Sequence, residues 1–384
     1  MKKYWAYVII SAITALLFFI TVNYTFIERA PKQLLQSKDL STHPIYSKYK
    51  FEISDNIINI GIQPFNIPTG IVTEVMKRDT ILVQSLKELG MEIRFYAFLK
   101  GADVNYFVKK GYLNAAHCGD MPTIMMASNS DIVIALMTQL GYTAIIAKQQ
   151  TLISELKGKK IGYAFGSDAH YALMAALAQE GLNESDVKLI QMDAYLMPEA
   201  LKTNLIYAFS VWEPTDSLSV RNNINAFAIH KMLSTQYLYF SKEFYDKKRQ
   251  AANLIIASEL RAINWLLTNK GNRMIAASWV IKSTKDLNKI QSQSLTEELI
   301  EELTLKMLLN LTSTPFIPEN IIMHDGPIYK ECIFLKKIGL LSADADWNKI
   351  HNSFTNDALI EILANTNNYR IKEFKYMIND IENE

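Results

Sequence analysis

The sequence predicts an α/β fold, because from Asn56 onward short apolar runs typical of strands alternate with helical stretches. Such alternation is typical of βαβ units that build a largely parallel sheet. The segments 111–116 and 204–209 resemble one another, and each follows a helix and leads into a strand, which favours two similar lobes. So short a match also arises by chance. With 384 residues, 49% of them apolar, the chain can bury one or two cores of common domain size.

The order of the expected elements follows the alternation. Strands are predicted at 57–62, 91–98, 115–118, 132–137, 160–163, 187–191 and 207–211, with a further apolar run at 142–147. Helices are predicted at 70–89, 104–110, 122–127, 152–156, 168–180 and 197–202. After His230 the chain is expected to be mainly helical, notably at 241–269 and 296–311.

The N-terminus carries the first strong local signal. Lys2 and Lys3 precede a charge-free apolar run at 4–22, close to the roughly 20 residues that cross a bilayer as a helix. Glu28 and Pro31 flank the nearest alanine and make a poor cleavage site for a signal peptide. We expect an uncleaved transmembrane helix, with a cleaved signal or a buried soluble helix as alternatives. In the first two cases the lysines stay inside and the rest of the chain is exported.

Composition and motifs exclude several function classes. Lys and Arg total 40 against 39 Asp and Glu, so the formal charge of +1 gives no electrostatic case for nucleic acid as a partner. The sequence has no GxxxxGK phosphate loop, no GxGxxG after a strand, no HExxH and no GxSxG elbow. We therefore expect no enzyme, no cofactor and no metal.

The cysteines and histidines support the same conclusion. Cys118 and Cys332 are too few for a disulfide scaffold and show no metal-ligand spacing, although one bond between them is possible in an oxidising compartment. The six histidines are spread singly. A nucleophile pair of Cys118 with His117 is disfavoured, because adjacent residues on a strand point to opposite faces.

A series of short motifs between Ile60 and Pro214 resembles the pattern of a known family in the order and spacing of its members. The motifs are IGIQ at 60–63, KGYLNAA at 110–116, GDMP at 119–122, LKGKKIG at 156–162, GSDAH at 166–170, GL at 181–182 with DV at 186–187, and WEP at 212–214. Together they resemble the periplasmic substrate-binding proteins of ABC importers for taurine, aliphatic sulfonates and nitrate, a family with NMT1-like pyrimidine-precursor binders among its members. The predicted helix 241–269, with Arg261-Ala262, also resembles that family's return helix.

This chain departs from the family pattern at three positions. Asn114 and Tyr207 stand where the family has an acid before alanine, and Asn204 stands where it has a glycine. These departures mark a divergent branch and weaken any transfer of ligand identity.

The resemblance implies a two-lobed clamp of the type II periplasmic-binding-protein fold, with ligand held between the lobes. The implied organisation is an anchor or signal segment at 1–27, a linker at 28–54, lobe one at 55–143 and 233–345, lobe two at 144–232 and a helical extension at 346–384. The chain would cross between lobes near 142–148 and 227–233. The implied partners are a small solute, ABC permease and ATPase subunits, and the membrane through the N-terminal helix.

The resemblance leaves three functions open. The leading interpretation is an extracytoplasmic importer receptor on the periplasmic or extracellular face of the cytoplasmic membrane. A membrane-anchored sensory domain with the same fold is the second. The third is a pyrimidine-precursor binding or synthesis protein, which is disfavoured because the cysteine-rich segment of that synthase is missing here.

The loop at Gly166 to Asp168 is the first candidate for ligand binding. It lies between a predicted strand and a predicted helix, so the first N–H groups of the helix lack partners and suit a sulfonate, carboxylate or nitrate. Ser167 could add its hydroxyl or simply cap the helix. Asp168 replaces the uncharged residue that the family often has there, and its carboxylate would oppose an anion if it faced the ligand.

The remaining candidates lie at other strand ends. His170 could donate to ligand or pack against the loop, and Glu213 beside Trp212 could hold an ammonium group or fix the hinge. The ring of strand-end loops is completed by Gln63, Asp120 and Thr123. Because Asp168 and Glu213 bring negative charge, we expect a zwitterion or an amphiphilic organic acid as ligand and not bare nitrate.

Overall fold

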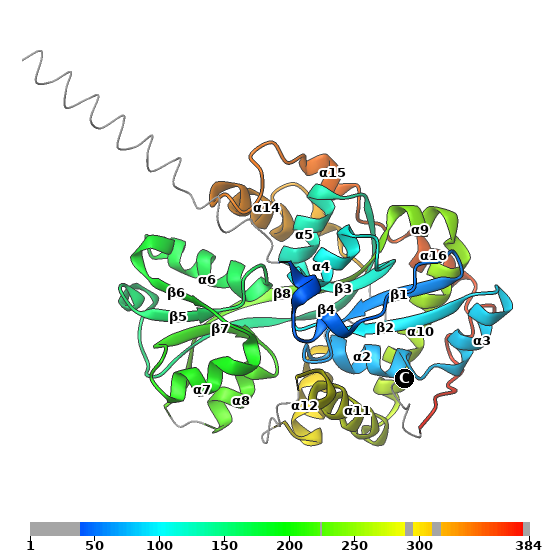
Figure 1. Cartoon of the computed structure of the whole chain (residues 1–384), viewed down its shortest axis with the longest axis horizontal. Coiled ribbons are helices and arrows are strands. Elements are labelled where there is room, and N and C mark those ends of the chain that lie inside the picture. The colour runs from blue at the N-terminus through cyan, green and yellow to red at the C-terminus, as the bar shows by residue number, and fades with distance from the viewer. Residues whose placement is uncertain (1–38, 223–224, 289–294, 309–315, 379–384) are drawn as a thin grey trace, which may run out of the picture. The chain divides into compact units, whose positions relative to one another are not determined.

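The mixed eight-stranded sheet of Figure 1 organises the chain in this computed structural model, which describes residues 39–222, 225–288, 295–308 and 316–378. Residues 44–384 form one unit, and residues 1–43 belong to another, in which η1 (Leu40–Thr42) is described. The predicted N-terminal transmembrane helix lies outside the described residues. Within the described ranges, no helix has the length and apolar character needed to cross a membrane.

The strands follow the order β2-β1-β3-β8-β4-β7-β5-β6 across the sheet. Their bounds are β1 Ile57–Ile62, β2 Glu92–Ala97, β3 Ala115–Gly119, β4 Ile132–Ala147, β5 Lys160–Tyr163, β6 Lys188–Gln191, β7 Ala208–Trp212 and β8 Phe227–Ser241. Both ends of the sheet are parallel, but β8 pairs antiparallel with β3 and β4, and β4 pairs antiparallel with β7. The prediction of a largely parallel sheet is therefore wrong for the middle of the sheet.

Helices cover both faces of this sheet. They are α2 Thr69–Met76, α3 Thr80–Glu88, α4 Gly101–Lys109, α5 Asp120–Asn129, α6 Asp168–Gln179, α7 Met197–Lys202, α8 Thr215–Asn222, α9 Lys242–Lys247, α10 Arg249–Thr268, α11 Lys270–Asn288, α12 Glu297–Leu308, α13 Glu319–Ile322, α14 Pro327–Lys337, α15 Trp347–His351 and α16 Asp357–Ala364. Short 3-10 turns lie at η2 Tyr46–Lys48, η3 Ile153–Leu156, η4 Glu184–Asp186 and η5 Ala194–Leu196. At the β5, β6 and β7 end, α6 lies on one face and α7 and α8 on the other (Figure 1).

Three longer predictions need correction. The predicted helix 70–89 is two helices, because Asp79 caps a new helix, α3, after α2 has ended. The predicted helix 241–269 is α9 and α10, separated at Lys248. The expectation of a mainly helical chain after His230 missed β8, which continues to Ser241.

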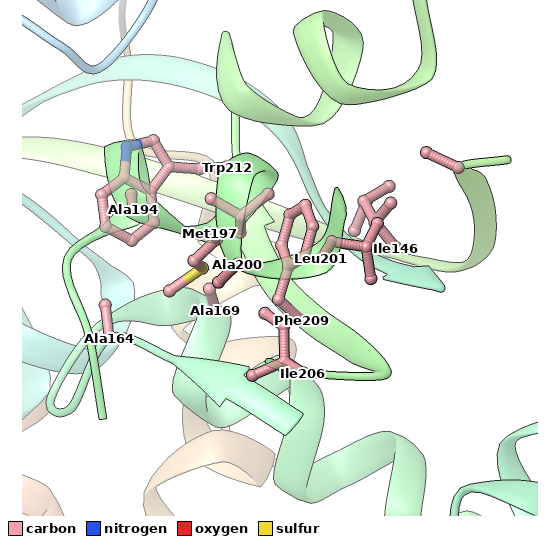
Figure 2. Packing of buried hydrophobic residues seen from close by; sticks show 13 residues of the cluster. Ile146, Ala164, Ala169, Ala194, Met197, Ala200, Leu201, Ile206, Phe209 and Trp212 are labelled. Carbon is pink, nitrogen blue, oxygen red and sulfur yellow. The ribbon is translucent and has the colours of Figure 1, made fainter. Parts of the chain in front are cut away.

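Alternation along β4 explains why its last four residues, Ala144 to Ala147, are all apolar. Ala144 and Ile146 pack into a cluster on one face of the sheet, together with Phe209 and residues of α7 (Figure 2). Ile145 and Ala147 pack into a second cluster on the opposite face, which includes residues of α6. Because successive side chains of a strand point to opposite faces, a segment covered on both faces by apolar clusters is apolar at every position.

Cys118 and Cys332 are both buried and free. The disulfide that the sequence left open between them is therefore not formed in this structure. Cys118 lies on β3 with its Sγ atom 3.8 Å from the Tyr239 hydroxyl, and Cys332 lies on α14.

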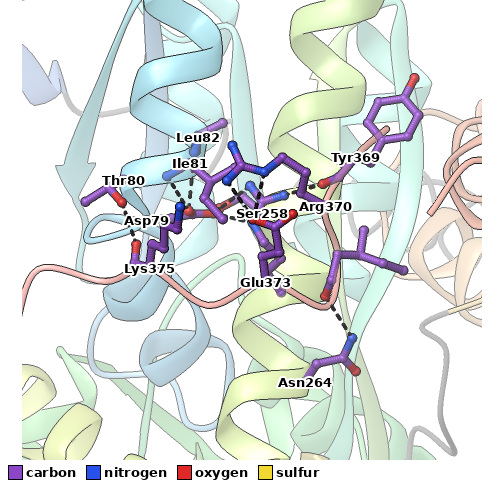
Figure 3. Close-up of polar contacts among 12 residues, drawn as sticks. Asp79, Thr80, Ile81, Leu82, Ser258, Asn264, Tyr369, Arg370, Glu373 and Lys375 are labelled. Atoms are coloured by element: carbon purple, nitrogen blue, oxygen red, sulfur yellow. Dashed lines mark hydrogen bonds and ion pairs between the residues drawn. The ribbon is translucent and has the colours of Figure 1, made fainter. Parts of the chain in front are cut away.

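One buried ion pair joins three separate segments. Asp79 caps α3 by accepting hydrogen bonds from the N–H groups of Ile81 (2.9 Å) and Leu82 (3.2 Å). Its Oδ2 atom accepts from Nε of Arg261 on α10 at 2.8 Å, and Arg261 Nη1 donates to the carbonyl of Tyr369 at 2.7 Å. Figure 3 shows Asp79 and Tyr369 in this network. The pair thus links the segment after α16 to helices α3 and α10.

We predict that Arg261→Met lowers the free energy of unfolding by about 3–5 kcal/mol, because Asp79 would be left charged and buried without its partner. Urea unfolding followed by circular dichroism measures the loss. Arg249→Met is the matched control on the same helix. Arg249 pairs with Glu361 at 3.4 Å with both side chains partly exposed, and its loss should cost at most about 1 kcal/mol. Equal losses for the two variants would contradict the prediction.

Candidate ligand-binding site at the paired strands

Polar residues interrupt the apolar strands β4 and β8 where the two cross the middle of the sheet. Thr138 and Gln139 lie on β4, and Ser234, Thr235 and Gln236 lie on β8, with Gln139 directly opposite Gln236. All five are buried. Since buried polar groups normally find hydrogen-bond partners, this polar segment needs polar neighbours from other elements.

The start of α2 supplies one of these neighbours. Gln139 Oε1 accepts hydrogen bonds from the backbone N–H (3.3 Å) and the hydroxyl (2.9 Å) of Thr69, the first residue of α2. An added Cβ at the next residue, Gly70, would lie 2.3 Å from the carbonyl oxygen of Pro64. The turn before α2 is therefore tightly packed, and Gln139 joins the start of α2 to β4.

The starts of α5 and α6 supply two acids. Asp120 Oδ2 accepts from the N–H of Thr235 at 3.0 Å and from its hydroxyl at 3.4 Å. Asp168 Oδ2 accepts from Nε2 of Gln236 at 3.3 Å and from the hydroxyl of Ser234 at 3.5 Å. Two predicted site residues, from segments 48 positions apart in sequence, thus bind neighbouring residues of one strand.

Asp120 and Asp168 also lie against one another. Burial raises the pKa of Asp120. Burial and, second, the negative charge of Asp120 raise the pKa of Asp168 well above its ordinary value. At Gly119, the last residue of β3, an added Cβ would lie 1.9–2.0 Å from the carboxylate oxygens of Asp168. The start of α6 therefore touches the end of β3 with no space between them.

A third acid, Glu331 on α14, joins this pair. It is 3% exposed, and its pKa is raised well above the ordinary value by burial first and then by the charges of Asp120 and Asp168. Glu331 is not among the residues that the sequence predicted for the site. Its position within a short charged helix gives no signal of burial, because the burial follows from the docking of α14 against α5 and α6.

Ser167 and His170 form a self-contained helix cap. Ser167 Oγ donates to the carbonyl of Ala164 at 2.7 Å and accepts from the N–H of His170 at 3.3 Å. His170 Nδ1 accepts from the N–H of Gly166 at 3.4 Å, and its ring lies 4.8 Å from that of Tyr163. Burial lowers the pKa of His170 to about 4, so the imidazole is neutral at physiological pH. This geometry accounts for both side chains by packing and capping.

Trp212 and Glu213 lie at the end of β7 and are both buried. The Glu213 carboxylate accepts from the N–H (3.0 Å) and the hydroxyl (2.8 Å) of Ser217, and so caps α8. Burial, and then the charge of Asp216, raise the pKa of Glu213. The indole Nε1 of Trp212 is buried and has no hydrogen-bond partner within the described ranges.

Gln63 and Thr123 support the end of β3. Gln63 Nε2 donates to the carbonyl of His117 at 2.8 Å, and the Thr123 hydroxyl donates to the carbonyl of Cys118 at 3.3 Å. Of the nine predicted site residues, Asp120 and Asp168 are the two whose carboxyls meet. In the part of the chain that the structure describes, no group of His, Cys, Asp and Glu has an arrangement that could hold a metal ion.

The fold is shared with solved solute-binding proteins. The alkanesulfonate-binding protein SsuA from Xanthomonas axonopodis pv. citri, bound to MOPS, superposes with a TM-score of 0.59 at 14% identity, covering 79% of this chain and 99% of that one. The periplasmic nitrate-binding protein NrtA from Synechocystis PCC 6803 gives 0.58 at 15% identity, covering 80% and 89%. At such identities the likeness establishes the α/β periplasmic-binding-protein fold alone.

Sequence relatives point the same way. The taurine-binding periplasmic protein of Escherichia coli (strain K12) is 26% identical over 132 residues, which cover 33% of this chain and 41% of that protein. The matched region spans about half the length of the curated relatives, from 41% to 56%. The sequence model of the NMT1-like family matches residues 86–281, just over half of the 384 residues. The chain belongs to the NMT1-like family.

Proposed function

We propose that this chain is the extracytoplasmic solute-binding protein of an ABC-type importer and captures a small organic anion or zwitterion. The observation that carries the proposal is the buried polar segment of β4 and β8, against which the starts of α2, α5 and α6 converge. Ligands in α/β folds bind where helix starts and strand ends meet. The family and the relatives named for taurine and alkanesulfonate support the same class of function.

The two long strands supply the proposed hinge. β4 and β8 pair from Ile132 to Ala147, and the sheet continues through β3 on one side and β7 on the other. We assign 55–143 and 233–345 to lobe one and 144–232 to lobe two. Bending between the lobes would separate Asp168 of lobe two from Gly119 and Asp120 of lobe one. Solute would enter on opening, and the permease and ATPase would respond to the closed form.

The donors that meet an anionic group lie at the β4 and β7 pair in this proposal. Thr143 of β4 is opposite Trp212 of β7. The Thr143 hydroxyl and the Trp212 indole N–H are both buried, and neither has a partner in the described part of the chain. Each of these orphaned donors would gain a charge-assisted hydrogen bond to a sulfonate or carboxylate.

We predict that the full chain binds at least one solute from a panel of taurine, ethanesulfonate, MOPS and nitrate with one site per chain. Trp212→Phe should weaken that binding about tenfold to a hundredfold, because a hydrogen bond to a charged group, worth about 1.5–3 kcal/mol, is lost while the aromatic ring stays. Isothermal titration calorimetry measures both effects. Trp347→Phe on α15 is the matched control and should bind as the wild type does. Absence of binding by every panel member to folded protein would refute the proposed function.

A second prediction concerns pH. The pKa of Asp168 is raised in the folded chain, so the unfolded chain loses this proton at lower pH. Binding of this proton therefore stabilises the folded chain. The stabilisation is complete below the pKa that Asp168 has in the unfolded chain, and it is lost as the pH rises through the pKa of Asp168 in the folded chain. Asp168→Asn removes this loss and should make the ligand-free protein more stable than the wild type near neutral pH.

Urea unfolding between about pH 4 and pH 8 checks the sign. Asp186→Asn is the opposite control, because a hydrogen bond from the N–H of Asn183 and the charge of Lys157 lower the pKa of Asp186. That variant should be less stable than the wild type near neutral pH, and the difference in stability should shrink as the pH falls. An Asp168→Asn variant that is less stable than the wild type near neutral pH would contradict the assignment.

A further inference from the structure

Three buried acids on three different helices lie in the region beside the polar segment of β8. Asp120 begins α5, Asp168 begins α6, and Glu331 lies within α14. They are 5%, 5% and 3% exposed. Burial, and then the charges of Asp120 and Asp168, raise the pKa of Glu331 well above its ordinary value. We call these three residues the carboxyl cluster.

The carboxyl cluster has acceptors in excess. No ion pair found among the described residues includes any of its members, so no Lys, Arg or His side chain neutralises it there. Oδ1 of Asp168 and Oε1 of Glu331 accept no hydrogen bond within the described ranges. Buried carboxyls without a cation or sufficient donors are costly, so the arrangement is not explained by fold stability.

Gln236 provides an independent observation. Its side chain is 2% exposed, and its Nε2 donates to Asp168 Oδ2, which places the amide against the carboxyl cluster. The Oε1 atom of the same amide is buried and accepts from no group that the structure describes. An amide oxygen and carboxylate oxygens in one place are all acceptors. A compact group with several hydrogen-bond donors and a positive charge would satisfy all of these acceptors.

We propose that the carboxyl cluster, with the Gln236 amide oxygen, recognises a positively charged nitrogen group of the solute, a primary ammonium or an amidinium. This inference rests on the proposed function and narrows its ligand class to solutes that carry such a group beside the anionic end. An ammonium group has three donors, and its charge opposes those of the carboxylates.

Glu331 makes the proposal specific to this chain. It lies on α14, in the C-terminal part of the sequence and outside residues 86–281, where the family model matches. The helix packs against both α5 and α6, the helices that begin with the two aspartates. In the ligand-free protein, protons relieve the repulsion among the three carboxyls; on binding, the ammonium group takes over this role and protons are released to solvent.

Other titratable groups near the carboxyl cluster do not replace the cation. They are phenols and thiols whose pKa values burial raises, so they stay neutral, and they come from β3, α6, β8 and α14: Cys118, Tyr171, Tyr237 and Cys332.

Matched solutes test the inference with the full chain. Each pair keeps the anionic end and the length and exchanges ammonium for hydroxyl: taurine with isethionate, 3-aminopropanesulfonate with 3-hydroxypropanesulfonate, and β-alanine with 3-hydroxypropanoate. We expect the ammonium member of the best-bound pair to bind at least about tenfold more tightly, as for a charge-assisted hydrogen bond. Calorimetry in two buffers of different ionisation heat should show proton release for that member and none for its hydroxyl counterpart.

Two variants locate the effect. Asp168→Asn and Glu331→Gln keep the shape of the neutral acids, and each should remove most of the advantage of the ammonium member over its hydroxyl counterpart. Glu199→Gln, on the exposed surface of α7, is the control and should change neither. Thermal unfolding of each variant establishes that it is folded.

The outcomes separate the two proposals. If no solute of either kind binds the folded wild type, the proposed function fails and this inference fails with it. If hydroxyl members bind as tightly as ammonium members, or if both variants keep the full ammonium advantage, the inference is overturned and the proposed function stands. Preference for ammonium that falls in both variants and not in the control supports the carboxyl cluster as the recognition site.

Discussion

The pairing of β4 with β8 is the constraint on which the rest of the molecule depends. These strands run antiparallel over almost their whole lengths, and each carries one end of the sheet on its outer edge. Their register sets Gln139 opposite Gln236 and so gathers the polar side chains in one place. The starts of α5 and α6 reach that place because β3 and β5, which precede them, are fixed to the same pair through the sheet.

Two opposite electrostatic effects act on the acids at the starts of α5 and α6. An ionised acid in the first turn stabilises a helix, since it neutralises the positive end of the helix dipole. Asp120 and Asp168 occupy such positions but are buried beside one another, which favours their neutral forms. The gain from the dipole is therefore partly lost in the ligand-free protein. Residues that are locally unfavourable for stability are expected at functional sites, because such sites are organised to bind a ligand.

Local sequence signals predicted the parts of this fold that local forces determine. The bounds of β1, β5 and α7 agree with the pattern of apolar residues, and Asp120 and Asp168 were found from their places after strands. β8 was missed because its first half is exposed and carries no uniform pattern, so that only its pairing with β4 makes it a strand. Glu331 was missed because its burial depends on α14 docking from the opposite end of the sequence.

Gly119 has a consequence for how this protein can change over time. Its backbone is extended, with φ of −67° and ψ of 178°, so any residue could adopt its conformation. Glycine fits here because the Asp168 carboxylate fills the space that a side chain would need, so a larger residue would displace that carboxylate. Substitutions at 119 and 168 are therefore expected to be coupled. A side chain at 119 fits most easily where the one at 168 is shorter, and an aspartate at 168 favours glycine at 119.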